Sequence, residues 1–77
     1  MIYDISNCNR TGIGKRVKEA RTERKMTLKE MSERCYMTEP GLSRIENGLS
    51  FPSVVTIAYL AKALNVSADT LIFGNAG

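Results

Sequence analysis

The stretch Thr27–Gly48, TLKEMSERCYMTEPGLSRIENG, constrains the fold more than any other part of the sequence. Thr27 and Glu30 stand at the spacing of a capping box, in which each side chain accepts a hydrogen bond from the other residue's backbone N–H. Three apolar residues then recur at helical spacing and predict one buried face: Leu28, Met31 and Cys35. The pattern therefore predicts a short helix that starts at Thr27.

A second short helix follows a break in this apolar pattern. Thr38 is a candidate N-cap, and Leu42 and Ile45 would face inward. Gly48 can adopt the positive φ that commonly ends a helix. Two helices this short bury too little apolar surface to be stable alone, so they must pack on each other and on the rest of the chain.

A helix is also predicted before this pair, from Thr11 as N-cap to about Lys25. Its inward stripe consists of apolar residues at helical spacing: Ile13, Val17 and Ala20. The segment Gly12–Lys15 faintly resembles a phosphate-binding loop, but it lacks the preceding strand and the full spacing of that motif. The start of a helix is the ordinary explanation for it.

Two more helices are predicted after Gly48. The first has Ser53 as N-cap, Asn65 as a left-handed terminator and a wide apolar face: Val54, Ile57, Ala58, Leu60, Ala61 and Leu64. The second has Ser67 as N-cap and ends after Leu71, Ile72 and Phe73. The sequence thus predicts an all-α fold, a compact five-helix domain.

We expect this domain at residues 11–74, between an N-terminal extension at residues 1–10 and a tail at residues 75–77. The extension contains Ile2, Tyr3 and Ile5, which could form a short strand, an arm over the domain, a dimer contact or a partly ordered end. A chain of 77 residues has a thin core, for which oligomerisation is a common supplement.

Composition argues against several classes of function. The chain has no His and no CxxC pair, so the usual zinc patterns are absent, and no nucleophile or paired carboxylates suggest an enzyme or a cofactor. Cys8 and Cys35 are read as two thiols of a cytoplasmic protein, with one disulfide left open. No apolar run is long enough to span a membrane. The net charge is +3, and the basic residues are concentrated between Arg10 and Lys29.

The helix pair resembles the helix-turn-helix of the phage repressor and Cro family, also called Xre-like regulators. The residues that carry the resemblance are Thr27, Met31, Ser32, Cys35, Met37, Thr38, Leu42, Ser43, Arg44, Ile45, Glu46, Asn47 and Gly48. It continues through Pro52–Ser53 and the segment ALNVSADTL, and covers about Ile13 to Phe73. The resemblance implies a lambda repressor-like domain with the helix-turn-helix as helices 2 and 3.

The resemblance also implies roles at the DNA. The second helix of the pair would enter the major groove, and four of its residues would read bases: Glu39, Pro40, Ser43 and Arg44. Residues expected at the phosphate backbone or flanking bases are Lys15, Arg16, Lys18, Thr27, Leu28, Lys29 and Asn47. Leu28 replaces a common Gln, and Lys25 and Tyr36 stand where Gly is frequent. The loop after Gly48 is apolar instead of basic, so fewer polar DNA contacts are expected.

Arg21 and Glu46 are expected to form a partly buried ion pair, because both lie beside apolar stripes and the resemblance implies the same pair. Dimerisation is expected through Leu71, Ile72 and Phe73 as first choice. The loop residues Leu49 and Phe51 or the N-terminal arm are the second choice, and closure of the core by Leu71 and Ile72 is the alternative.

The function predicted from the sequence is a DNA-binding transcription regulator, a repressor that acts as a homodimer on a palindromic operator of double-stranded DNA. No small-molecule ligand is expected. The alternative is a non-enzymatic protein-interaction module that retains the fold, such as an antitoxin-like or adaptor protein. The basic first helix and Arg44 favour DNA, whereas Leu28 and the apolar loop favour a protein partner.

Overall fold

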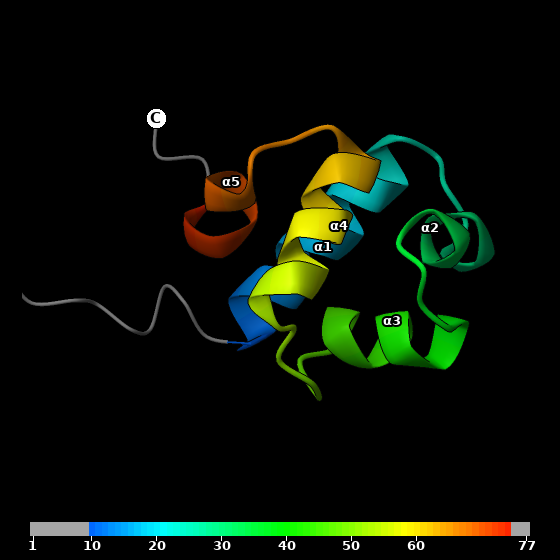
Figure 1. Ribbon diagram of the computed structural model, residues 1–77, viewed down its shortest axis with the longest axis horizontal. Coiled ribbons are helices and arrows are strands. Elements are labelled where there is room, and N and C mark those ends of the chain that lie inside the picture. The colour runs from blue at the N-terminus through cyan, green and yellow to red at the C-terminus, as the bar shows by residue number, and fades with distance from the viewer. Residues whose placement is uncertain (1–9, 75–77) are drawn as a thin grey trace, which may run out of the picture.

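Helices succeed one another along residues 10–74, the part of the chain that the structure, a computed structural model, describes. In order they are α1 (Arg10–Glu23), α2 (Leu28–Arg34), α3 (Glu39–Glu46), α4 (Val54–Leu64) and α5 (Ala68–Phe73) (Figure 1). The predicted all-α, five-helix fold is confirmed for these residues. The predictions for the N-terminal arm, for Cys8 and for the tail at residues 75–77 concern parts of the chain outside the described residues.

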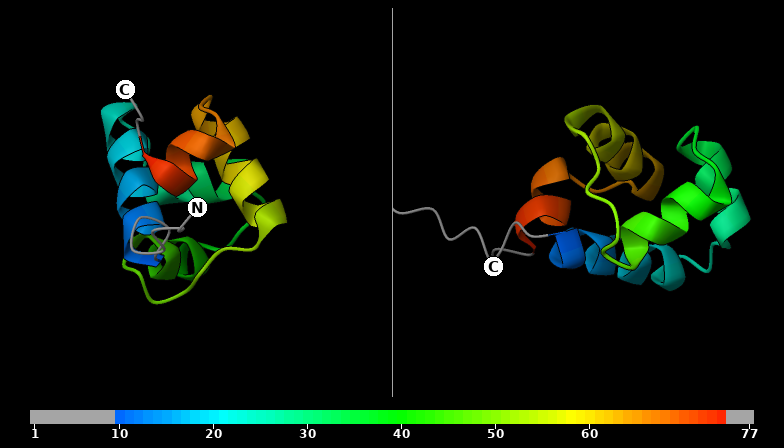
Figure 2. Two further views of the ribbon diagram at one scale, coloured as in Figure 1. Left: turned by 90° about the vertical axis from the view of Figure 1, so that its left-hand side faces the viewer. Right: turned by 90° about the horizontal axis from the view of Figure 1, so that it is seen from below.

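Helix α1 lies at the centre of the arrangement. It contacts α3, α5 and α4, while α2 packs on α3 and α4. Two further views show α3 and α5 on different sides of α1 (Figure 2). The core is one cluster of buried apolar side chains: Ile13, Val17, Met31, Cys35, Leu42, Ile57, Leu60, Ala61, Leu64 and Leu71. None of the described helices is long and apolar enough to cross a membrane.

Four hydroxyl side chains cap the N-termini of the helices after α1. Each accepts a hydrogen bond from the backbone N–H three residues later, and they are Thr27, Thr38, Ser53 and Ser67. These four predicted N-caps are confirmed. The prediction for Thr11 was wrong: α1 already begins at Arg10, so Thr11 has helical backbone and cannot be the non-helical cap residue.

A residue in the left-handed region follows each of the first four helices: Lys25 (φ 56°), Tyr36 (φ 59°), Gly48 (φ 75°) and Asn65 (φ 58°). At the first of these ends, the N–H of Met26 donates to the carbonyl of Arg21 at 3.1 Å and the N–H of Lys25 to that of Thr22 at 3.0 Å. This is the Schellman pattern of hydrogen bonds. Helix α1 therefore ends at Glu23, two residues before the predicted end, and the backbone of Lys25 is strained, as expected.

The apolar face predicted for α4 was too wide. Ile57, Leu60, Ala61 and Leu64 are buried, but Val54 is 83% exposed and Ala58 is also exposed. Among the described residues, the helices that contact α4 are α5, α1 and α2. Val54 and Ala58 therefore face solvent, although both are apolar.

Candidate nucleic-acid interface

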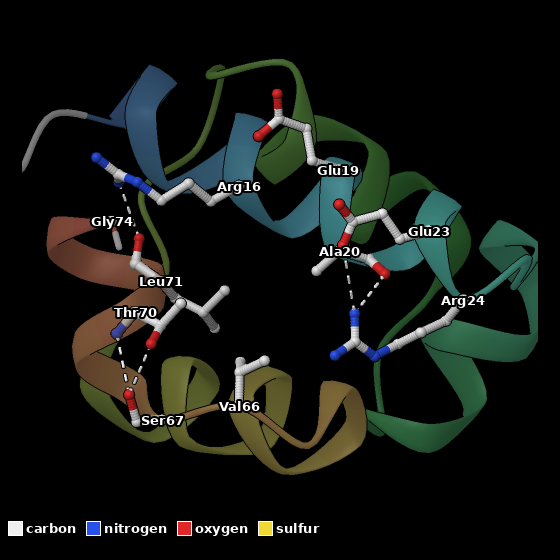
Figure 3. Close-up of a pocket in the computed structure, with 10 residues that line it drawn as sticks. All are labelled: Arg16, Glu19, Ala20, Glu23, Arg24, Val66, Ser67, Thr70, Leu71 and Gly74. Atoms are coloured by element: carbon white, nitrogen blue, oxygen red, sulfur yellow. Dashed lines mark hydrogen bonds and ion pairs between the residues drawn. The ribbon is translucent and has the colours of Figure 1, made fainter. Parts of the chain in front are cut away.

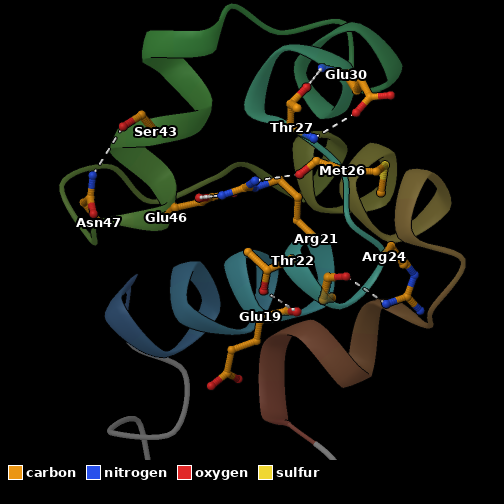
Figure 4. Close-up of polar contacts among 11 residues, drawn as sticks. Glu19, Arg21, Thr22, Arg24, Met26, Thr27, Glu30, Ser43, Glu46 and Asn47 are labelled. Carbon is orange, nitrogen blue, oxygen red and sulfur yellow. Dashed lines mark hydrogen bonds and ion pairs between the residues drawn. The ribbon is translucent and has the colours of Figure 1, made fainter.

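A buried ion pair fixes α3 to α1. The Nε of Arg21 donates to Oε2 of Glu46 at 2.8 Å, and its Nη2 donates to Oε1 at 3.1 Å (Figure 4). The third donor, Nη1, reaches the carbonyl of Met26 at 2.7 Å in the turn before α2. In this bidentate geometry both carboxylate oxygens accept a hydrogen bond, as a buried ion pair requires. Arg21 therefore joins α1, the turn before α2 and the end of α3, and the pair predicted from the sequence is present.

A glycine lets α1 approach the end of α3 closely. A Cβ atom added to Gly14 would collide with the backbone carbonyl of Ile45. Only a residue without a side chain fits between the two backbones at this point. Gly14 thus has a packing role, and it belongs to a helix rather than to a phosphate-binding loop.

The outer face of α3 carries the residues predicted to read bases. Leu42, Ile45 and Glu46 are buried on the inner face. The outer side chains are exposed apart from the half-buried Ser43, and the set is Glu39, Pro40, Ser43, Arg44 and Asn47. The Nδ2 of Asn47 donates to the Oγ of Ser43 at 3.3 Å, which links the last two turns (Figure 4). One surface of α3 therefore presents a carboxylate, a hydroxyl, a guanidinium and an amide side chain together.

The start of α2 contains a complete capping box. The Oγ1 of Thr27 accepts from the N–H of Glu30 at 3.0 Å, and Oε1 of Glu30 accepts from the N–H of Thr27 at 2.9 Å. The Thr27 backbone N–H, together with the Thr27 hydroxyl, lowers the pKa of the Glu30 carboxyl. Leu28 is half-buried against the core and Lys29 is exposed. Of these residues, the exposed Thr27 and Lys29 are the ones able to hydrogen-bond to a phosphate.

The basic residues of α1 divide between two sides of the helix. Lys15 and Lys18 are exposed. The Nη1 of Arg16 instead donates to the carbonyls of Leu71 and Ile72 at 2.9 and 3.1 Å, at the end of α5. Because Arg16 lies about half a turn from Gly14, it faces away from α3. The structure therefore places Arg16 with α5 and not with the predicted backbone-contacting residues.

A cavity of about 490 Å³ lies between α1 and α5 (Figure 3). Arg16 and Glu19 line it from α1 and Arg24 from the turn after α1, while Ser67 and Thr70 line it from the other side. Several of its polar groups have partners within the protein: Nη1 of Arg24 donates to the carbonyl of Ala20 at 2.9 Å, and the hydroxyl oxygens of Ser67 and Thr70 lie 2.8 Å apart. The described residues contain no group of three or more His, Cys, Asp or Glu that could hold a metal ion.

The three residues expected at a dimer contact at the end of α5 differ in burial. Leu71 is 1% exposed and belongs to the core, Ile72 is half-buried against it, and Phe73 is 41% exposed. Leu71 cannot contact a second chain without leaving the core. The alternative weighed from the sequence, closure of the core, therefore applies to Leu71.

Sequence reasoning missed an exposed apolar surface on α4 and the end of α2. Val54, Val55 and Tyr59 are exposed on α4, and Tyr36 is 82% exposed. The rings of Tyr36 and Tyr59 meet edge to face with centroids 5.3 Å apart. The adjacent valines of the sequence could have signalled this surface, because one inward stripe cannot bury two neighbouring helical positions fully.

Comparison with known proteins places this chain in a known protein family. The profile of a helix-turn-helix family matches residues 17–71. The chain is 36% identical over 58 residues to Rv0474 of Mycobacterium tuberculosis, an uncharacterized HTH-type transcriptional regulator, covering 75% of this chain and 41% of that protein. It is 34% identical over 61 residues to RghR of Bacillus subtilis, an HTH-type transcriptional repressor, covering 78% and 45%. The chain thus spans less than half the length of these curated relatives.

Solved structures show the same arrangement of helices. The N-terminal DNA-binding domain of SinR from Bacillus subtilis matches with a TM-score of 0.77 and 32% identity, over 84% of this chain and 96% of that one. A crystal structure of SinR, described as the master regulator for biofilm formation, in complex with DNA matches with a TM-score of 0.73 and 35% identity. That match covers 77% of this chain and 95% of the SinR chain.

Proposed function

Because the chain belongs to the helix-turn-helix family, in its phage repressor and Cro type, we propose that it is a sequence-specific regulator of transcription that binds double-stranded DNA. The observation that carries the proposal is the outer face of α3. Its polar side chains are exposed together, while the inner face is fixed by the Arg21–Glu46 pair. A rigid helix with a polar outer face suits insertion into the major groove.

Arg44 is the principal base-reading residue of this proposal. A guanidinium can donate two hydrogen bonds to O6 and N7 of guanine, and Arg44 is the exposed arginine of α3. Glu39 can accept a hydrogen bond from N4 of cytosine, and Ser43 tolerates several bases. Pro40 lies in the first turn, where its ring can contact a base edge but forms no hydrogen bond. Specificity should therefore depend mainly on Arg44.

Phosphate contacts would hold the domain in register. Thr27 lies at the start of α2 and Asn47 at the end of α3, before and after the proposed reading residues in the sequence. Lys29, Lys15 and Lys18 supply exposed positive charge, and Leu28 contributes only apolar contact. Arg16 is left out of the set, because it binds the end of α5.

We further propose that the protein binds a palindromic operator as a symmetric homodimer and represses transcription. One small domain reads few base pairs, and a two-fold dimer doubles the site. Repression is supported by the similarity to RghR, an HTH-type transcriptional repressor that is 34% identical to this chain over 61 residues. Phosphates neutralised by two copies would also double the electrostatic contribution to affinity.

Selection of bound sequences from a random duplex library tests the proposal. We expect an enriched motif with two inverted half-sites about one helical turn apart, and a binding constant whose logarithm falls linearly with the logarithm of salt concentration. An unselected duplex serves as the control and should show the salt dependence without the sequence preference. A library that yields no motif, with no salt-dependent binding to any duplex, would contradict DNA binding.

The exposed apolar surface favours a second candidate function, a protein-interaction module that retains the fold. Leu49 and Phe51 of the α3–α4 loop are both more than half exposed, at a place where basic residues would contact phosphates. On this alternative, binding of random duplex DNA would be weak and nearly independent of salt, because few counterions would be released. The salt titration above therefore separates the two functions.

A further inference from the structure

Ser43 and Asn47 are joined by a side-chain hydrogen bond on the outer face of α3. The two residues are four positions apart, so their side chains are neighbours on the surface of the helix. The Nδ2 of Asn47 donates to the Oγ of Ser43 at 3.3 Å, on the side of α3 away from Glu46 (Figure 4). The Ser43 oxygen is the acceptor, so this bond does not use the hydroxyl hydrogen.

Two other hydroxyls within the described helices use their hydrogen inside the protein. The Oγ1 of Thr22 donates to the carbonyl of Glu19 at 3.0 Å. The Oγ of Ser32 donates to the carbonyl of Lys29 at 2.8 Å. Such bonds to the preceding turn are a common way for Ser and Thr to pair a hydroxyl within a helix. Within the described residues, the Ser43 hydroxyl donates to no such carbonyl, and the hydrogen bond that it makes is the one it accepts.

The bond from Asn47 decides which hydrogen-bonding group Ser43 presents to a partner. A hydroxyl has one hydrogen and two acceptor lone pairs, and the amide occupies one of the lone pairs. Because the amide hydrogen points at the Ser43 oxygen, the hydroxyl hydrogen must point elsewhere. Connected hydrogen bonds polarise one another, so a hydroxyl that accepts one becomes a better donor. A donor that is buried at a base edge without an acceptor costs free energy, so the facing base should supply one.

We infer that Asn47 is a positioning residue for base reading, and that through it Ser43 selects a base with an acceptor at its major-groove edge. Guanine offers two acceptors there, N7 and O6, and thymine offers O4, whereas cytosine offers only the N4 donor. The inference rests on the proposed function. It narrows the broad tolerance of a serine to guanine or thymine, with adenine intermediate because it carries both an acceptor and a donor.

The same amide can also serve the phosphate contact proposed for Asn47. An Asn side chain has two amide hydrogens, and the bond to Ser43 uses one of them. The second can be donated to a phosphate oxygen next to the base that Ser43 reads. One side chain would then connect a contact that sets the register on the DNA backbone with a contact that reads sequence.

The hydrogen bond itself is tested without DNA. In the heteronuclear NMR spectrum of the free chain, Ser43→Ala should shift the side-chain amide signals of Asn47. It should also raise their temperature dependence, because one amide hydrogen loses its acceptor within the protein. The side-chain amide of Asn65, at the end of α4, is the internal control and should not change. Unchanged Asn47 signals would show that the bond is not formed and would overturn the inference, whether or not the chain binds DNA.

Selection from a random duplex library then tests base reading. Ser43→Ala identifies the base that Ser43 faces, as the position at which the wild-type preference disappears. There the wild type should prefer guanine or thymine to cytosine by roughly twofold to tenfold, the range of one hydrogen bond. Asn47→Asp should reverse the order in favour of cytosine and adenine. A carboxylate only accepts, so it takes the Ser43 hydrogen and leaves the oxygen to accept from N4 of cytosine or N6 of adenine.

A double variant separates positioning from direct contact by the new carboxylate. If Asn47→Asp acts through Ser43, its combination with Ser43→Ala should show no preference at this position. A cytosine preference that survives in the double variant would mean that the carboxylate itself contacts the base, which overturns the positioning role. A guanine or thymine preference that persists in Asn47→Asp, or a wild-type preference for cytosine, would overturn it too.

The two measurements distinguish failure of this inference from failure of the proposed function. Asn47 signals that respond to Ser43→Ala, together with no sequence enriched by the wild type, would leave the hydrogen bond standing and reject base reading along with DNA binding. An enriched operator whose preference at the Ser43 position does not depend on Asn47 would keep the proposed function and reject this inference alone.

Discussion

Gly14 of α1 lies directly against the backbone carbonyl of Ile45 in α3, with no room for a Cβ atom between them. This contact, together with the Arg21–Glu46 pair about two turns further along α1, sets how closely α3 approaches α1. The position of the proposed reading helix therefore depends on the absence of a side chain at one residue.

The first prediction concerns that contact. Gly14→Ala should lower the free energy of unfolding by at least about 3 kcal/mol, because the new methyl group meets backbone, which cannot rotate away as a side chain can. A urea titration followed by circular dichroism measures the change. Gly41→Ala is the control: a Cβ there meets only the Thr38 hydroxyl and the end of Met37, and the gain in helix propensity offsets this, so the change should stay within about 1 kcal/mol. Equal effects of the two substitutions would show that the close approach is not a constraint.

The second prediction concerns the buried ion pair. Glu46→Ala should cost roughly 3–5 kcal/mol, because the buried Arg21 guanidinium keeps its charge and loses both carboxylate oxygens. Arg21→Ala should cost a similar amount, and the double variant should cost clearly less than the sum. A loss below about 0.5 kcal/mol for Glu46→Ala in a denaturant titration would show that the pair contributes no more than a surface contact.

A third prediction concerns the left-handed residue after α1. Lys25→Gly should raise the free energy of unfolding by about 0.5–1 kcal/mol, because the strain of a side chain at φ 56° exceeds the backbone entropy that glycine loses on folding. Thermal unfolding at neutral pH measures the gain. Asn65→Gly, at φ 58°, is the matched control and should gain less, since Asn adopts this conformation more readily than Lys. A loss of stability in Lys25→Gly would argue that its side chain makes stabilising contacts.

Base reading by Arg44 leads to the fourth prediction. On a selected operator, Arg44→Ala should lose about 1–3 kcal/mol of binding free energy at one base position per half-site and relax the preference there. Lys29→Ala should instead weaken binding to all duplexes alike and reduce the salt slope by about one unit. Fluorescence anisotropy at several salt concentrations distinguishes the two. If Arg44→Ala binds both the operator and random duplex like the wild type, α3 does not read DNA.

Burial of Cys35 gives the last prediction. Burial raises the pKa of the Cys35 thiol to about 11, since the thiolate would lose its hydration in the core. In the unfolded chain the thiol ionises first, near its ordinary pKa of about 8.5, so the unfolded state binds fewer protons as pH rises between the two values. The stability of the wild type should therefore decline over this range. Cys35→Ala should lack this part of the decline, and parallel curves for both proteins would contradict a raised pKa.

Much of the local structure could be predicted from single residues. Thr27, Thr38, Ser53 and Ser67 cap their helices as expected, since a capping hydroxyl acts within three residues of its own position. The same locality explains why Gly48 and Asn65 were identified correctly as left-handed terminators. The ion pair of Arg21 and Glu46 could be predicted because two charges beside apolar stripes need partners.

The sequence by itself determined that the chain is all-α and that a polar set of residues follows Thr38, because helix caps, terminators and apolar periodicity are local properties of the chain. Only the tertiary structure decided which apolar residues are covered. Leu71 is buried because α5 packs on α1 and α4, whereas Val54 is exposed because nothing among the described residues packs on the outside of α4. Arg16 likewise binds the end of α5 instead of facing α3. Burial depends on which helices meet in space, and these long-range contacts are not encoded in the spacing of any one helix.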